Sequence, residues 1–155
     1  MKFSKAFSLI ELIFVIVILG ILAAVALPKL GNTAVQAQIA KGRADIATIR
    51  AAIVNERQTR LILGDSDYIT KANMDTASGL FGGVLTYPIA NSNTDGDWYT
   101  ATIDNGSYTY NVNGIGVDFT YNDSTAATVA DRGTFTCSTT AGSAAQNDMC
   151  SKLIN

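Results

Sequence analysis

The sequence contains no histidine, and among its 155 residues only two are cysteine and two are proline. Without histidine, the protein lacks the side chain that most often acts as a general base and most often binds metals. It also contains no recognisable nucleophile motif or phosphate-binding loop. We therefore expect no enzyme activity, no catalytic residue and no cofactor. One enzyme class stays open, because pairs of carboxylates cleave glycosidic bonds, although the many aspartates lie in turn-like contexts.

Charged residues are unevenly distributed along the chain. Residues 7–63 hold six basic residues against three acidic ones, whereas residues 64–155 hold ten acidic residues against three basic ones. An acidic C-terminal part repels polyanions, so we expect no specific nucleic-acid site there. The same charge also serves plain solubility.

The two cysteines, Cys137 and Cys150, lie near the C-terminus and do not form a CxxC motif. Their spacing suits a local disulfide, which would stabilise the fold by about 3 kcal/mol in the chain-entropy model. Such a bond would place this part of the chain in an oxidising compartment. Two free, buried thiols are the alternative.

An almost unbroken apolar stretch occupies residues 7–27, interrupted only by Ser8, Glu11 and Gly20. A membrane-spanning helix needs about 20 such residues, and a helix of a soluble domain is rarely apolar on every side. A carboxylate at membrane depth costs roughly 2.5–3.5 kcal/mol on insertion scales. The stretch therefore predicts a membrane span in which Glu11 needs an explanation.

The segment before this stretch, "MKFSKA", has two lysines and ends on the small residue Ala6. In an ordinary signal peptide the small residue follows the apolar stretch, whereas here it precedes it. Cleavage between Ala6 and Phe7 would therefore leave the apolar helix on the mature protein. The lysines favour a cytoplasmic N-terminus, so the residues after Pro28 would lie across the membrane, where a disulfide can persist.

The residues "AFSLIEL" and "ILGILAAVALPKL" resemble the prepilin leader and N-terminal helix of type IV pilins and type II secretion pseudopilins. The resemblance implies that a prepilin peptidase cuts between Ala6 and Phe7 and methylates the new amino group of Phe7. Glu11 matches the buried glutamate of the family. Gly20 and Pro28 match helix-loosening positions between which the helix is partly unwound in filaments. One departure is Ala6, where the family usually has glycine.

Cleavage would give Glu11 a possible partner, the new amino group of Phe7. The two residues are four apart, so they could pair within one chain, where the helix dipole also favours a carboxylate in the first turn. The resemblance implies instead that Glu11 pairs with Phe7 of a neighbouring subunit. Such a pair would favour one docking register, which is the best-attested role of buried ion pairs. We prefer the neighbour; a membrane anchor with an incidental glutamate is the alternative.

Beyond Pro28 the pattern becomes amphipathic, and we expect one helix to continue to about residue 63, before Gly64. A stripe at helical spacing should pack under the following domain; it consists of Ile39, Gly42, Ile46, Ile49 and Ile53. The expected organisation is a leader at 1–6, a membrane and assembly half-helix at 7–28, an amphipathic half-helix at 29–63 and a head at 64–155.

The head is rich in turn-forming residues and then alternates between apolar and polar residues. We expect an irregular or partly helical connector at 63–83, strands near 97–103, 107–113, 117–121 and 133–139, and a hairpin turn at Asn105–Gly106. A small antiparallel sheet with one face against the long helix is the economical arrangement. The predicted fold class is therefore α+β, with the pilin architecture.

The resemblance also bears on the C-terminal part of the head. Many type IV pilins have a disulfide loop in this region, as Cys137 and Cys150 would form, whereas major pseudopilins often lack it and carry a calcium site. The weak candidate for a cation here is Asn93, Asp95 and Asp97 in "NTDGD". The full twelve-residue calcium loop is missing, and Asp and Gly also simply make turns, so we expect no metal.

We predict a structural subunit of a type IV pilus-like filament. It would be stored in the inner membrane as a single-pass protein with a cytoplasmic N-terminus, and would end in a periplasmic or cell-surface filament. The expected partners are further copies of this chain, a prepilin peptidase, membrane-embedded assembly machinery and, before assembly, membrane lipid. The alternatives are a pseudopilin of a type II secretion system, which forms a short periplasmic filament, and an anchored periplasmic protein that does not assemble.

Overall fold

The structure is a computed structural model that describes residues 8–155, apart from the side chains of residues 27–30. Ala6 and Phe7, the expected cleavage site, lie outside the described residues. The chain divides into two compact units, Met1–Gln36 and Ala37–Asn155. The helix α1 (Leu9–Ile62) contributes residues to both units.

The first unit contains the N-terminal part of α1. The Ser8 carbonyl accepts hydrogen bonds from the N–H groups of Glu11 and Leu12 at 3.1 and 3.2 Å, which begins the helix. Glu11 lies in the first turn, where the partial positive charge of the helix N-terminus favours a carboxylate. The helix continues through Pro28.

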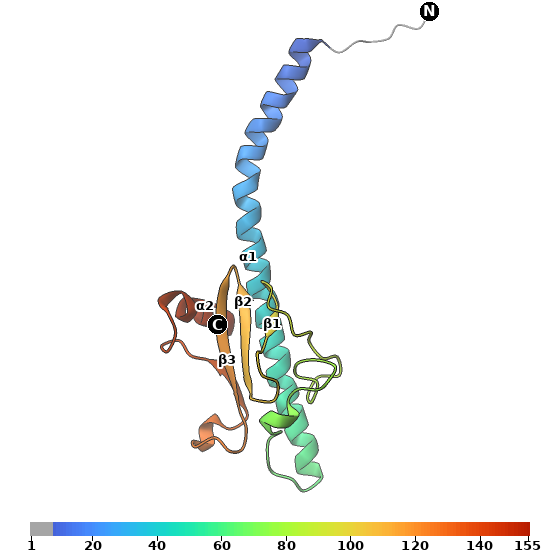
Figure 1. Cartoon of the computed structure of the whole chain (residues 1–155), viewed down its shortest axis with the longest axis vertical. Coiled ribbons are helices and arrows are strands. Elements are labelled where there is room, and N and C mark those ends of the chain that lie inside the picture. Colours follow the sequence, from blue (N-terminus) through green and yellow to red (C-terminus); the bar gives the residue numbers. More distant parts are fainter. Residues whose placement is uncertain (1–7) are drawn as a thin grey trace, which may run out of the picture. The chain divides into compact units, whose positions relative to one another are not determined.

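In the second unit a four-stranded sheet lies beside α1 (Figure 1). Its strands are β1 (Trp98–Tyr99), β2 (Ser107–Val112), β3 (Ile115–Asn122) and β4 (Thr134–Cys137). They are joined in the order β1-β2-β3-β4, and every pairing is antiparallel. The predicted α+β class, a long helix with a small antiparallel sheet, is confirmed.

The core of the second unit forms between the isoleucine stripe of α1 and an aromatic face of the sheet. Ile46, Ile49 and Ile53 are at most 2% exposed. The alternation predicted for the strands is present, because the buried positions of β2 and β3 are the expected ones; they are Tyr108, Tyr110, Val112, Val117, Phe119 and Tyr121. Trp98 and Phe135 also belong to this buried cluster and pack edge-on, tilted or stacked on its other rings.

Each buried tyrosine keeps its hydroxyl bonded. Tyr110 donates to the Gln38 carbonyl at 2.7 Å, and Tyr121 donates to the Ile69 carbonyl at 2.7 Å. Tyr108 donates to the Asp75 carboxylate at 3.0 Å. Burial raises the pKa of all three phenols, so they stay neutral donors that fix the sheet to α1 and to the connector.

The predicted hairpin across Asn105–Gly106 is present, because the consecutive strands β1 and β2 pair antiparallel. Its loop is longer than the expected turn and spans residues 100–106. The strand before it ends at Tyr99, because Thr100 turns to other partners: its N–H donates to Asn91 Oδ1 at 3.1 Å and its hydroxyl donates to the Ser107 carbonyl at 2.8 Å. Side-chain bonds of this kind compete with a strand ladder. The two-residue hairpin lies instead at Asn113–Gly114 between β2 and β3, where both residues have positive φ, 50° and 74°, as a type I′ turn requires.

The connector after α1 is irregular and partly helical, as predicted. Gly64 follows the helix with a φ of 87°, which glycine adopts readily. A short 3₁₀ helix, η1 (Lys71–Asn73), follows, and a second, η2 (Val129–Asp131), lies between β3 and β4. The buried Asp75 carboxylate accepts a hydrogen bond from the Phe81 N–H at 2.9 Å as well as the one from Tyr108. It therefore joins the connector to the aromatic face of the sheet.

A C-terminal helix, α2 (Ala144–Ile154), was missed by the sequence analysis, although its start signal is present. The Ser143 hydroxyl accepts from the Gln146 N–H, and the Gln146 side chain accepts from the Ser143 N–H, which is the capping box Ser-x-x-Gln. Gln146 also donates to the Gly116 carbonyl of β3 at 2.8 Å.

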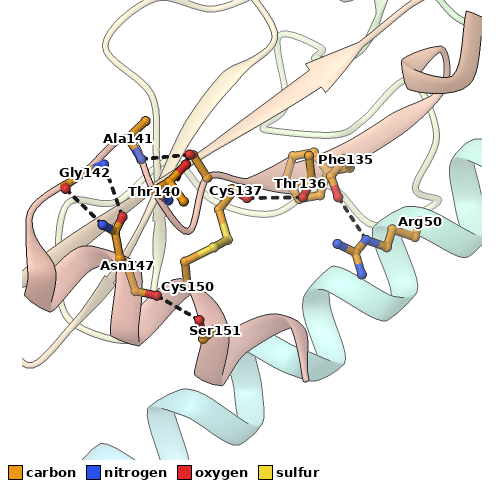
Figure 2. Close-up of a disulfide and its surroundings, with 11 residues drawn as sticks. Arg50, Phe135, Thr136, Cys137, Thr140, Ala141, Gly142, Asn147, Cys150 and Ser151 are labelled. Carbon is orange, nitrogen blue, oxygen red and sulfur yellow. Dashed lines mark hydrogen bonds between the residues drawn. A yellow bond between two sulfur atoms is a disulfide. The ribbon is translucent and has the colours of Figure 1, made fainter.

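The predicted disulfide is confirmed. Cys137 at the end of β4 is bonded to Cys150 in α2, with their Cα atoms 6.0 Å apart (Figure 2). In the same region Arg50 Nε of α1 donates to the Phe135 carbonyl at 2.9 Å. The disulfide therefore joins the edge strand to the last helix, while Arg50 ties that strand to α1.

Candidate functional site

The candidate site is the exposed apolar segment of α1 at residues 9–26, which we call the apolar segment. Its large side chains are exposed on every side of the helix, from 41% at Ile18 to 77% at Leu9. By length and composition, α1 is long and apolar enough to cross a membrane, and none of its most apolar window is buried. A surface of this kind is unstable in water, so it requires lipid or other protein around it.

Glu11 is the charged residue of the apolar segment, and it is exposed. Among residues 8–155, none provides a hydrogen bond or an ion pair to its carboxylate. The amino group expected to pair with it belongs to Phe7, outside the described part of the chain. The pairing of Glu11, within a chain or between chains, therefore stays a prediction.

Gly20 and Pro28 are the expected loosening positions of the same helix. Among the described residues, apart from the adjacent helix backbone, nothing lies within 4 Å of the place a Cβ would take at Gly20, so this glycine leaves open space on the helix surface. Pro28 lies inside α1, which is continuous on either side of it. The partial unwinding of residues 20–28 was expected in an assembled filament, and it stays a prediction.

The second unit brings the loop at residues 93–97, the weak metal candidate, against α1. Asp97 forms an ion pair with Lys41 at 2.7 Å and accepts from the Thr94 hydroxyl at 2.7 Å. Asp95 accepts from the Gly114 N–H at 2.8 Å, and Asn93 accepts from the Asn111 amide at 3.0 Å. Each of the three side chains thus binds a different protein donor. In the described chain no group of three or more His, Cys, Asp or Glu residues could hold a metal ion.

The pKa values of two carboxylates, Asp97 in this loop and Asp45 on α1, are shifted in opposite directions. The hydrogen bond from Lys41, followed by that from Thr94, lowers the pKa of Asp97. Burial raises the pKa of the neighbouring Asp45, despite a hydrogen bond from Trp98 Nε1 at 3.1 Å. The sequence analysis missed both contacts, because Lys41 and Asp45 are more than fifty positions away from their partners.

Comparisons with known proteins bear on the N-terminal segment first. Residues 1–27 match the protein family described as "Prokaryotic N-terminal methylation motif". The chain has a prepilin-type N-terminus. The match covers the leader, the expected cleavage site, Glu11 and Gly20, and ends just before Pro28.

Two curated proteins are similar to the chain over a longer part of its length. The type IV major fimbrial protein FimA of Dichelobacter nodosus is 39% identical over 81 residues, covering 49% of this chain and 48% of that protein. The fimbrial protein of Moraxella nonliquefaciens is 33% identical over 82 residues, covering 53% of each. The chain thus spans about half the length of the curated relatives it matches. No solved structure matches the chain.

Proposed function

We propose that this prepilin-type chain is the structural subunit of a type IV pilus-like filament, and that the apolar segment first anchors it in the inner membrane and then joins subunits in the filament. The observation that carries this proposal is the segment itself. It is exposed on every side and includes one carboxylate with no partner among the described residues. Lipid can cover the apolar side chains but leaves Glu11 unpaired, whereas a neighbouring subunit can satisfy both.

Processing by a prepilin peptidase would complete this arrangement. Cleavage between Ala6 and Phe7 would free the amino group of Phe7, four residues before Glu11 in the sequence, and the peptidase would then methylate it. In a bundle of such helices the amino group of one chain can approach Glu11 of the next. The family match over residues 1–27 supports the processing step. The named fimbrial relatives support a structural role for the chain rather than an enzymatic one.

We further propose that the second unit forms the exposed head of the filament and lies outside the cytoplasm before assembly. The Cys137–Cys150 disulfide supports this placement, because such bonds persist in oxidising compartments. The disulfide also favours a surface pilus over a secretion pseudopilus, since the resemblance associates a C-terminal disulfide with pilins. Membrane-embedded assembly machinery would be the remaining partner.

Two measurements test this proposal: the mass of the mature protein, and the presence of surface filaments on cells with and without the gene. Intact-mass analysis of the membrane form should give a chain that begins at N-methyl-Phe7 and contains one disulfide. Deletion of the gene should remove long filaments from the cell surface, and expression of the chain should restore them. A mature chain that still begins at Met1 would contradict the proposal, while surface filaments that persist without this subunit would favour the pseudopilin.

A further inference from the structure

The second unit has a polar cavity of about 400 Å³ near the C-terminal end of α1, which we call the two-arginine pocket. We propose that this pocket binds a phosphate- or sulfate-bearing ligand, a function independent of filament assembly. Its polar lining comes from three segments that are distant in the sequence: Arg57 of α1, Ser66, Asp67 and Tyr68 of the connector, and Ser124 and Arg132 of the β3–β4 connection.

Arg57 is held in position by an aromatic ring, and none of the described residues forms a hydrogen bond with its guanidinium. Its guanidinium lies over the Tyr68 ring, 4.2 Å from the ring centre. The same ring packs closely against Gly133, where a Cβ would overlap Tyr68 and the φ of 74° favours glycine. Arg57 Nε is buried and has no hydrogen-bond partner in the part of the chain that the structure describes. A buried guanidinium N–H without an acceptor is costly, and an oxyanion in the pocket would supply one.

Arg132, the second arginine of the pocket, is also oriented and keeps hydrogen-bond donors available. Arg132 Nε donates to the Ala126 carbonyl at 3.2 Å, which directs the guanidinium while the structure assigns no partner among residues 8–155 to its two terminal nitrogens. The Ser124 hydroxyl accepts from the Tyr68 N–H at 2.7 Å, so its own proton remains available to a ligand. The pocket thus collects two guanidinium groups and hydroxyl donors around one space.

The charge of the pocket differs from that of the head around it. Residues 64–155 hold ten acidic residues and three basic ones, yet the pocket lining combines two arginines with one carboxylate, Asp67. Asp67 forms no ion pair with either arginine among the described contacts. The arginine charges are therefore not neutralised, and Asp67 opposes an incoming anion.

The number of donors indicates the class of ligand. A carboxylate presents two oxygens and is satisfied by one arginine fork, whereas a phosphate or sulfate group presents three or more and can accept from two guanidiniums and a hydroxyl at once. The cavity is also larger than a bare oxyanion requires. The ligand is therefore a phosphate or sulfate group, free or carried on a larger molecule.

The test uses NMR on the full chain in non-ionic detergent micelles and follows the arginine side-chain Nε–Hε signals. Each titration adds one anion: inorganic phosphate, sulfate, glycerol phosphate, glycerophosphoglycerol or acetate. Arg50 is the internal reference, because its Nε is already bonded to the Phe135 carbonyl. We expect saturable shifts of Arg57 and Arg132 with phosphate and sulfate, weaker binding of acetate, and no saturable shift of Arg50. If glycerophosphoglycerol also gives saturable shifts, the natural ligand is a phosphodiester of a lipid or a polymer. If inorganic phosphate and glycerol phosphate give them but glycerophosphoglycerol does not, the natural ligand carries a terminal phosphate.

Three variants make the test specific. Because hydrogen bonds to charged groups contribute about 1.5–3 kcal/mol, Arg132→Gln should weaken phosphate binding by about tenfold or more. Arg57→Lys keeps the charge but loses the planar fork and should also weaken it, whereas Asp67→Asn should strengthen it. Thermal unfolding of each variant checks that the head remains folded. Equal, non-saturating shifts of every arginine, or unchanged affinity in Arg132→Gln, would overturn the proposal.

Discussion

Asp45 and Asp97 lie near each other on the second unit, and their carboxylates should respond to pH in opposite directions. Burial raises the pKa of Asp45, so its ionised form destabilises the fold, and this cost grows as the pH rises through its folded pKa. The Lys41 and Thr94 bonds lower the pKa of Asp97, so its ionised form stabilises the fold, and that contribution is lost as the pH falls through its folded pKa.

We therefore predict that Asp45→Asn raises the unfolding temperature at pH 7, since an amide oxygen still accepts from Trp98 Nε1 without the cost of a desolvated charge. Asp97→Asn should lower the unfolding temperature. The expected loss of unfolding free energy is less than about 1 kcal/mol, because the Lys41 pair is partly exposed and screened by solvent. Thermal unfolding at pH 7 and at pH values below both folded pKa values is the measurement. At neutral pH the two substitutions should change the unfolding temperature in opposite directions, and in acid both variants should unfold like the wild type. Changes of the same sign at neutral pH would contradict these assignments.

Single residues also show what a sequence can and cannot predict about a site. Glu11 was identifiable because one carboxylate interrupts a long apolar run, a local and unusual pattern. Arg57 and Arg132 could not be paired in advance, because they are 75 positions apart and each alone is typical of a solvated surface. Only the folded connector, in which Tyr68 contacts Arg57 and packs against Gly133, places the two arginines in one pocket.

At the scale of elements, α1 packs closely against the sheet and α2 at Gly42. A Cβ at this position would come within 2.5 Å of Tyr110 Cε1 and 2.8 Å of Leu153 Cδ2, so the glycine permits the close packing of β2 and α2 on the helix. In contrast, at Gly31 on the same helix no described side chain lies within 4 Å of the place a Cβ would take. The two glycines form a matched pair within one element.

We predict that Gly42→Ala destabilises the protein by up to about 2 kcal/mol, because overpacking costs about 1–3 kcal/mol and the gain in helix propensity offsets about 1 kcal/mol of it. Gly31→Ala should be neutral or slightly stabilising in the unassembled chain, since it gains helix propensity without a clash. Chemical denaturation in detergent, with both variants measured beside the wild type, compares them. A Gly42→Ala protein as stable as Gly31→Ala would contradict the packing described for α1.

The elements differ in how far they could be predicted. The isoleucine stripe and the alternation in β2 and β3 identified the buried faces, since each follows the period of its own backbone. The hairpin between β1 and β2 was predicted, but its loop is longer than expected, because the side chain of Thr100, rather than the Asn105–Gly106 pair, decides where β1 ends. The start of α2 was marked by its capping box, yet its docking on β3 depends on a residue distant in sequence, Gly116.

On the scale of the whole molecule, the chain combines a head with a well-packed core and a helical segment that buries none of its apolar side chains. The composition alone separated these two parts, because a run of apolar residues without polar partners has no place in a small acidic domain. The sequence could not supply the surroundings of the apolar segment, since these belong to other molecules. Assembly is therefore the claim that requires measurement.

The most direct measurement compares filaments sheared from cells that express the wild type, Glu11→Ala or Asp131→Ala, the last being a control that removes an exposed carboxylate of the head. Membrane insertion of Glu11→Ala should be intact, because the change removes an insertion penalty of roughly 2.5–3.5 kcal/mol. The account predicts that Glu11→Ala is processed and forms few or no filaments alone, but enters filaments when the wild type supplies Glu11 from neighbouring chains, and that Asp131→Ala assembles normally. A normal filament yield from Glu11→Ala alone would contradict it.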